Sequence, residues 1–154
     1  MTRLYRILRR PFSKNPLNGE GAYRFGGRWS SAGVWLAYTA EHLSLAMIEY
    51  FVHIDADDAP RDLVVVAADV PAGVSRLAIS GKQLPSTWRR NPAPPGLAAI
   101  GDVFVSNCRA AILMAPSVLA PSEWNWLINP QHPDFSKIRV HKPEKFRYDS
   151  RFLG

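Results

Sequence analysis

Short apolar runs, separated by proline and glycine, dominate the pattern of hydrophobic and polar positions along the chain. Thirteen prolines and ten glycines divide it into many short elements, which favours mixed α and β structure over a helix bundle. The run 63–70 is continuously apolar at its start and β-branched at both ends, as is typical of a buried strand. The pattern predicts strands over residues 3–8, 34–38, 63–70, 103–106, 111–115 and 138–141.

One amphipathic helix is predicted between residues 39 and 53. Thr39 is expected as its cap and Glu41 in its first turn, where the helix dipole favours an acid. The apolar face follows helical spacing and comprises Leu43, Ala46, Met47, Tyr50, Phe51 and Ile54.

The rest of the chain reads as connections within one domain. Residues 11–33 are rich in glycine, serine, asparagine and proline and predict a long loop, which in a small domain is usually functional. Four prolines within 83–98 exclude a regular helix across that stretch, and 123–128 predicts one helical turn. With 154 residues, 47% hydrophobic and 21% charged, we expect a single α+β domain spanning 1–154.

Charge is unevenly distributed and suggests an anionic partner. Residues 1–50 carry seven basic and three acidic side chains, 51–110 carry six of each, and 111–154 carry six against four, which gives the net charge of +6. Basic ends suit a polyanion, an acidic protein or a phosphate-bearing substrate, although a solvated surface explains them equally well. No apolar run of signal-peptide or membrane-span type is present, so we expect a cytoplasmic protein without membrane association.

Several common functional motifs are absent. The single cysteine, Cys108, excludes an intramolecular disulfide and a zinc cluster built on thiolates. There is no dinucleotide fingerprint, P-loop, zinc-protease motif, calcium loop or hydrolase nucleophile elbow. We therefore expect no bound metal, and any nucleotide must be held without the two commonest nucleotide-binding motifs.

Four side chains are candidates for chemistry. Arg28, next to paired glycines, offers a planar fork of donors for phosphate, but it also fits a surface turn. Tyr38 ends a predicted strand and can lie over a ligand ring, or simply fill the core. Glu49 shares a helical stripe with His42 and His53, which either faces solvent or lines a cleft.

Ser117 follows the predicted strand 111–115. A hydroxyl there can bind a ligand amide, although most serines in such places cap turns. A carboxylate such as Glu49 can stabilise the positive charge that develops when a glycosidic bond breaks.

Taken in order along the chain, these segments resemble the RES domain family over nearly the whole length. The segments that carry the resemblance are Leu4-Tyr5-Arg6, Gly19-Glu20-Gly21, Gly26-Gly27-Arg28-Trp29-Ser30, Tyr38-Thr39-Ala40-Glu41, Ala46-Met47-Ile48-Glu49, Pro116-Ser117, Asn125-Trp126-Leu127-Ile128-Asn129-Pro130 with His132, and Phe146-Arg147-Tyr148-Asp149-Ser150-Arg151. The Arg, Glu and Ser that give the family its name are here Arg28, Glu49 and Ser117.

The resemblance implies a fold like that of the ADP-ribosyltransferase toxins, with a split sheet around an NAD cleft. It implies the toxin of a toxin–antitoxin pair that breaks the nicotinamide–ribose bond of NAD by hydrolysis or phosphorolysis. NAD is then a substrate and no cofactor is expected. The implied partner is an Xre-type antitoxin that blocks the cleft, and nucleic acid would be contacted only through this antitoxin. Whether the chain forms a homodimer is left open.

The resemblance also implies residue roles. Arg28 would bind the NAD phosphates with help from Arg6, and Tyr38 would pack on the nicotinamide or its ribose. Glu49 would hold the ribose and stabilise positive charge. Ser117 would contact the nicotinamide side, and Asn129 is a further candidate for substrate binding.

Three alternatives remain open at this point. A mono-ADP-ribosyltransferase with a protein acceptor needs the same site. A nucleic-acid binder or ribonuclease toxin fits the calculated pI of about 9.8, but no RNA-binding or helix-turn-helix motif supports it. An inactive member kept for partner binding is disfavoured because all the key residues are present.

Overall fold

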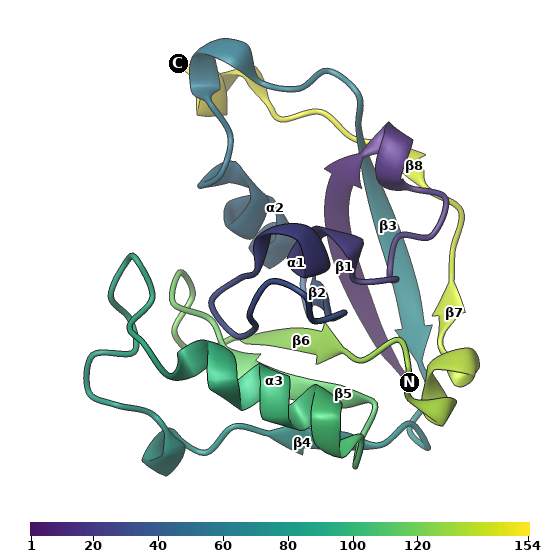
Figure 1. Ribbon diagram of the computed structural model, residues 1–154. Coiled ribbons are helices and arrows are strands. Elements are labelled where there is room, and N and C mark those ends of the chain that lie inside the picture. The colour runs from purple at the N-terminus through teal and green to yellow at the C-terminus, as the bar shows by residue number, and fades with distance from the viewer.

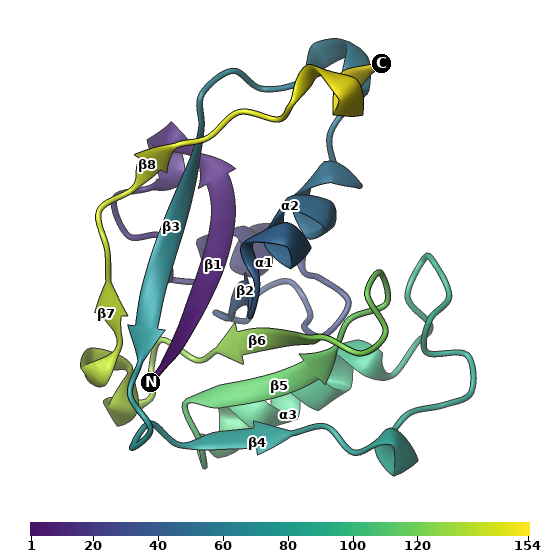
Figure 2. The same cartoon turned by 180° about the vertical axis from the view of Figure 1, so that it is seen from behind.

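Eight strands form one curled mixed sheet in the computed structural model, which describes residues 1–154 (Figures 1 and 2). The sheet order is β4-β5-β6-β2-β1-β3-β7, and β8 pairs with the other end of β3. Only β4 and β5 run parallel. The strands are β1 (Thr2–Arg9), β2 (Ala37–Ala40), β3 (Leu63–Val70), β4 (Arg76–Ala78), β5 (Ile112–Pro116), β6 (Trp124–Ile128), β7 (Arg139–Val140) and β8 (Glu144–Lys145).

Three α-helices and several single 3-10 turns complete the chain. The α-helices are α1 (Glu20–Phe25), α2 (Leu43–Phe51) and α3 (Leu97–Asn107). The 3-10 turns are η1 (Arg10–Phe12), η2 (Ala56–Asp58), η3 (Gly81–Gln83), η4 (Pro133–Lys137) and η5 (Ser150–Leu153). No helix is long or apolar enough to cross a bilayer.

The sheet has a seam between β1 and β2. β1 pairs with β3 along its whole length, from Thr2 opposite Val70 to Arg9 opposite Leu63. Between β1 and β2, in contrast, the register has one pair, Tyr5 opposite Ala40. One half of the sheet therefore consists of β4, β5, β6 and β2, and the other of β1, β3, β7 and β8.

Each half of the sheet has its own helix. α3 packs on the first half through Leu97 and Phe104, which join Leu113 and Leu127 in one buried cluster. α2 packs on the second half through Leu45 and Ala46, which meet Ile7 and Leu63, and it reaches across the seam to Ala40. A third cluster, around Leu4, Ile112, Trp126 and Ile128, lies on the other side of the sheet.

The α+β class and the strands predicted at 3–8, 63–70, 111–115 and 138–141 are confirmed, although the last covers only Arg139–Val140. The strand predicted at 34–38 is observed as β2, which begins at Ala37 and ends at Ala40. The prolines of 83–98 precede α3, which begins at Leu97. β4, β8 and α1, which forms inside the predicted loop 11–33, were not predicted.

The predicted start of the helix at Thr39 is wrong. Thr39 lies in β2 with its side chain buried, and its hydroxyl donates to the Trp126 carbonyl at 2.7 Å. Helix α2 begins at Leu43, so Glu41 precedes it. The face that α2 buries is also shifted, because Leu45 and Ala46 are buried whereas Leu43 is exposed.

Two further elements are the reverse of the prediction. Residues 103–106, predicted as a strand, lie within α3, whose buried positions Leu97, Gly101 and Phe104 follow helical spacing. Residues 123–128, predicted as a helical turn, form β6 between β2 and β5. A run of four to six apolar residues fits either structure, and here the neighbouring strands decide.

Candidate active site

A hydrogen bond between Glu49 and Ser117 joins α2 to the end of β5. The Ser117 hydroxyl is fully buried and donates to Glu49 Oε1 at 2.8 Å. The hydroxyl oxygen of Ser117 also accepts the backbone N–H groups of Leu119 and Ala120, each at 3.1 Å. With its proton and lone pairs all used, Ser117 fixes one carboxylate oxygen of Glu49, while Oε2 has no partner and is available to a ligand.

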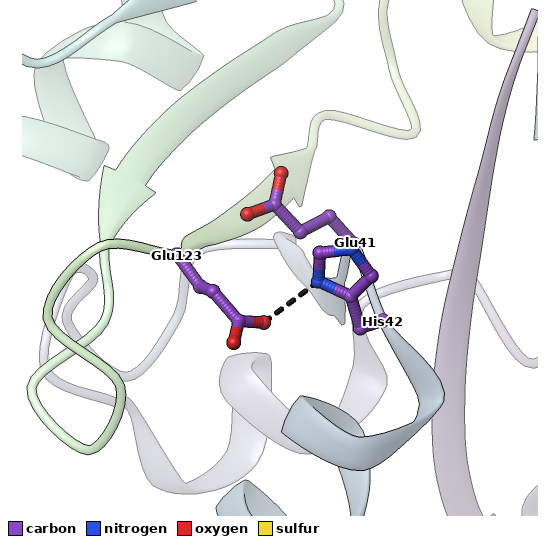
Figure 3. Close-up of side chains that lie close together, drawn as sticks. All are labelled: Glu41, His42 and Glu123. Carbon is purple, nitrogen blue, oxygen red and sulfur yellow. Dashed lines mark hydrogen bonds and ion pairs between the residues drawn. The ribbon is translucent and has the colours of Figure 1, made fainter.

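A main-chain hydrogen bond and three side chains, Glu41, His42 and Glu123, hold the loop that carries Ser117; we call these three side chains the clamp. Ser117 N–H donates to the Glu123 carbonyl at 3.0 Å, which continues the β5–β6 ladder beyond Pro116. Glu41 accepts the Trp124 N–H at 2.8 Å, and the His42 ring lies 2.7 Å from the Glu123 carboxylate (Figure 3). The turn 117–123 is therefore tied to the start of α2, the helix that carries Glu49.

Glu41, His42 and Glu123 are also the residues that could hold a metal ion. Their ligand atoms lie within 4.8 Å of one another. Each already makes a bond that orders the turn, since Glu41 accepts a backbone N–H and His42 pairs with Glu123. These bonds give the three residues a structural role in holding the turn. That the site binds no metal stays a prediction.

Tyr38 of β2 bonds to the loop that carries Arg28. The Tyr38 hydroxyl accepts the Trp29 N–H at 3.1 Å and shares a 2.8 Å hydrogen bond with Ser30 Oγ. Burial raises the pKa of Tyr38, so its hydroxyl stays protonated at neutral pH. Gly27 lies against the ring, because a Cβ built there would be 2.6 Å from the Tyr38 hydroxyl.

Arg28 is half-buried and has no acidic partner. Its Nη1 donates to the carbonyls of Trp88 at 2.8 Å and Arg90 at 2.9 Å. These bonds pin the segment between η3 and α3 to the loop that follows α1. Nε and Nη2 have no partner in the structure, so part of the guanidinium is left for an anion.

Asn125 of β6 lies on the sheet surface between the strand of Tyr38 and the end of the strand that Ser117 follows. It lies opposite Ala40 of β2 and opposite Ala115 of β5, so small side chains flank it on both sides. Side chains alternate along a strand, which puts Asn125 on the face that holds Leu127 and its register partner Tyr38. Ser117, two residues beyond Ala115, is a diagonal neighbour of Asn125, at roughly 7–8 Å between Cα atoms.

The Asn125 amide makes no hydrogen bond within the chain and is only half-buried. It was not predicted as a site residue. The sequence placed it in a helical turn, and its position next to two alanines is visible only in the strand register.

Arg6 lies on β1 beside α1, with its Nη2 3.7 Å from the position of a Cβ on Gly21. It has no ion-pair or hydrogen-bond partner, and burial lowers its pKa. Its neighbours Tyr5 and Ile7 point to the side that α2 covers, so alternation directs Arg6 to the other face. No contact joins it to Glu49, and its role stays a prediction.

Asn129 is not brought together with Glu49 and Ser117. It is fully buried at the far end of β6, where its N–H donates to the Ala111 carbonyl and its side chain accepts the Gln131 N–H at 3.0 Å. Ser117 lies at the other end of the β5–β6 pair. In this structure Asn129 shapes the turn after β6.

Comparisons with known proteins agree on one family. The RES domain model matches residues 3–150. The Prs ADP-ribosylating toxin of Sphingobium sp. (strain YBL2) is 36% identical over 147 residues, covering 94% of this chain and 91% of that protein. Toxin Res of Yersinia enterocolitica serotype O:8 is 32% identical over 149 residues, covering 96% and 97% of the two chains.

A solved structure has a similar fold at lower identity. The crystal structure of the M. tuberculosis MbcT–MbcA toxin–antitoxin complex contains a chain that superposes with a TM-score of 0.75 at 18% identity, covering 94% of this chain and 84% of the other. The family-model match over almost the whole length shows that the chain belongs to the RES domain family.

Proposed function

We propose that the chain is the toxin of a toxin–antitoxin pair and that it cleaves the nicotinamide–ribose bond of NAD. The observation that carries the proposal is the Glu49 carboxylate, held by buried Ser117 with its second oxygen free. Two relatives named as toxins, and a fold shared with a toxin–antitoxin complex, support the biological setting.

The chemistry asks for charge stabilisation at the ribose. As the bond between C1′ and the nicotinamide nitrogen breaks, its electron pair leaves with nicotinamide and C1′ becomes oxocarbenium-like. Glu49 would stabilise that charge and hold a ribose hydroxyl. Because Ser117 and the clamp fix the carboxylate beforehand, no reorganisation is needed at the moment of reaction.

The remaining residues would position the two ends of NAD. Arg28 would bind a phosphate through the nitrogens that Trp88 and Arg90 leave free. The hydroxyl of Tyr38 is occupied, so the residue would offer its ring face to the nicotinamide or ribose. Asn125 has a free donor and acceptor, which match the two polar atoms of the nicotinamide carboxamide.

Water, phosphate or a protein side chain could take the ribosyl group after nicotinamide leaves. Water would yield ADP-ribose and a proton, and phosphate would yield a phosphorylated ADP-ribose. Transfer to a protein is the second candidate function, and the name of the Sphingobium relative favours it. An Xre-type antitoxin that covers the site, and a cytoplasmic location, belong to the same proposal.

The test is nicotinamide release from NAD by purified, antitoxin-free protein, with and without phosphate. Glu49→Gln keeps the size and the hydrogen-bonding capacity but removes the charge, and we expect it to lower turnover by about 100-fold or more. Glu144→Gln, on exposed β8, is the matched control and should leave turnover unchanged.

The acceptor decides between the candidates. A phosphate requirement would make the protein a phosphorylase. Label transfer from NAD to a co-incubated lysate protein, with little free ADP-ribose, would favour the protein acceptor. Equal turnover by wild type and Glu49→Gln would refute the assignment of Glu49.

A further inference from the structure

A hollow of about 610 Å³ lies apart from the Glu49–Ser117 site, where the end of β1, the start of β3 and β8 meet. In Figures 1 and 2 β8 and the end of β1 lie away from the end of β5, the strand that Ser117 follows. Seven residues line it: Arg10, Arg61, Asp62, Leu63, Lys145, Phe146 and Arg147. We call it the basic hollow.

The positive charge of the basic hollow is not neutralised within the protein. Its one acid, Asp62, is bound by Arg9, which donates to both carboxylate oxygens at 3.0 Å. That pairing, together with the nearby Arg10, lowers the pKa of Asp62. The four cations of the lining, Arg10, Arg61, Lys145 and Arg147, have no ion-pair partner and no side-chain hydrogen bond.

Main-chain hydrogen bonds fix the segments that carry these cations. Arg10 N–H donates to the Asp62 carbonyl at 2.8 Å, and Phe146 N–H donates to the Leu63 carbonyl at 3.0 Å. Lys145 lies opposite Val64 in the β3–β8 ladder. Three separate stretches of chain therefore converge on one hollow, where four cations face a single acid, Asp62, whose two oxygens Arg9 already binds.

We propose that the basic hollow binds a compact anion that carries two or more phosphate groups, as in pyrophosphate or a nucleoside polyphosphate. Three of the four cations are arginines, whose planar forks match phosphate oxygens two at a time. Phe146, which is half-buried, supplies an apolar part of the lining on which a ring could rest.

The shape favours a small ligand over a nucleic acid. The cations converge around a concavity whose volume is in the range of small-molecule sites, about 300–1,000 Å³. A duplex would instead need an extended basic stripe that follows its backbone. This site is independent of NAD cleavage, because none of its lining residues belongs to the Glu49–Ser117 site.

Titration calorimetry with pyrophosphate, orthophosphate and a short DNA duplex tests the proposal on the full chain. The variant Arg61→Glu/Arg147→Glu reverses two cations of the hollow. The matched control Lys82→Glu/Arg109→Glu reverses two exposed cations elsewhere. Arg28→Ala reports on any pyrophosphate that binds at the candidate active site instead.

We expect pyrophosphate to bind wild type at least about tenfold more tightly than orthophosphate, with an affinity that falls as salt rises. The hollow variant should lose roughly tenfold or more, and the control variant and Arg28→Ala should bind like wild type. Equal binding by the hollow and control variants would overturn the proposal. So would loss of binding in Arg28→Ala alone, or tighter binding of the duplex than of pyrophosphate.

Discussion

At the scale of single residues, Asn125 is a candidate ligand contact because its half-buried amide has no hydrogen-bond partner and lies between two alanines. If its amide reads the nicotinamide carboxamide, Asn125→Ala should lower kcat/KM for NAD by about tenfold, the value of two neutral hydrogen bonds. It should affect an NAD analogue with an acetyl group in place of the carboxamide less, because that analogue lacks the amide donor. The measurement is the ratio of kcat/KM for the two substrates.

Asn107→Ala, at the exposed end of α3, is the control for the Asn125 prediction. Unchanged kcat/KM values for both substrates in Asn125→Ala would show that the amide makes no contact with NAD. Loss of both substrates in equal measure would point to the ribose or the phosphates instead.

Gly27 gives a second prediction at this scale. The Cβ of Gly27→Ala would lie 2.6 Å from the Tyr38 hydroxyl and 2.9 Å from Cζ. Tyr38 cannot withdraw without giving up its bonds to Trp29 and Ser30. We expect NAD turnover to fall by about tenfold with the fold retained, as for other misplaced positioning groups. Gly73→Ala, whose Cβ meets nothing within 4 Å, should leave turnover intact.

At the scale of elements, α3 holds the loop that carries Arg28. The Asp102 carboxylate accepts the Ser31 N–H at 2.8 Å on one oxygen and the Ser31 hydroxyl on the other. One residue earlier, Gly101 faces the Trp29 carbonyl so closely that an added Cβ would overlap it. The absence of a side chain at Gly101 therefore lets the helix backbone approach the loop directly.

Gly101→Ala should destabilise the protein, although glycine to alanine usually stabilises a helix. Overlap with Trp29 would cost roughly 1–3 kcal/mol, as overpacking does in other cores. The loss in the free energy of unfolding is measured by urea denaturation of Gly101→Ala and wild type. The control Ala99→Gly, at an exposed position of α3, should show the difference in helix propensity alone and lower the free energy of unfolding by about 1 kcal/mol. A Gly101→Ala protein more stable than wild type would show that the loop moves aside freely.

The elements show why part of the fold was predictable from the sequence. β3 buries a long apolar run, which is recognisable as a strand from the sequence alone. Residues 103–106 and 124–128 have equally apolar sequences, but tertiary neighbours decide their structure. The same holds at the site, where Glu49 and Ser117 are recognisable as family residues, whereas the place of Asn125 depends on a strand register that no local pattern encodes.

At the scale of the whole molecule, Asp69 connects three distant segments. Arg3 of β1 donates to Oδ1 of Asp69 in β3 at 2.8 Å, and His141, after β7, lies 2.6 Å from Oδ2. These bonds hold the pKa of Asp69 well below its ordinary value of 3.8. Bonds from Lys137 and Ser75 lower the pKa of Asp134 in the same way.

The sign of the pH dependence follows from these shifts. A carboxyl group with a lowered pKa in the folded state stabilises the fold above the unfolded pKa, and that contribution is lost as pH falls through the folded pKa. Asp69→Asn should therefore melt below wild type at neutral pH, and the gap should narrow as pH falls below 3.8. Thermal melts of both proteins, with Asp58→Asn as an exposed control, check this. If the difference in melting temperature between wild type and Asp69→Asn did not change with pH, the destabilisation would come from packing and not from the charge of Asp69.

The seam between β1 and β2 has a mechanical consequence. Because the two half-sheets share one residue pair, Tyr5 with Ala40, we expect them to turn about that pair, the pivot, more readily than within either ladder. Helix α2 braces the pivot, since it packs on both halves. A ligand that contacts both halves on the face of Tyr38 would oppose such a turn, because it would tie the halves together at a second place.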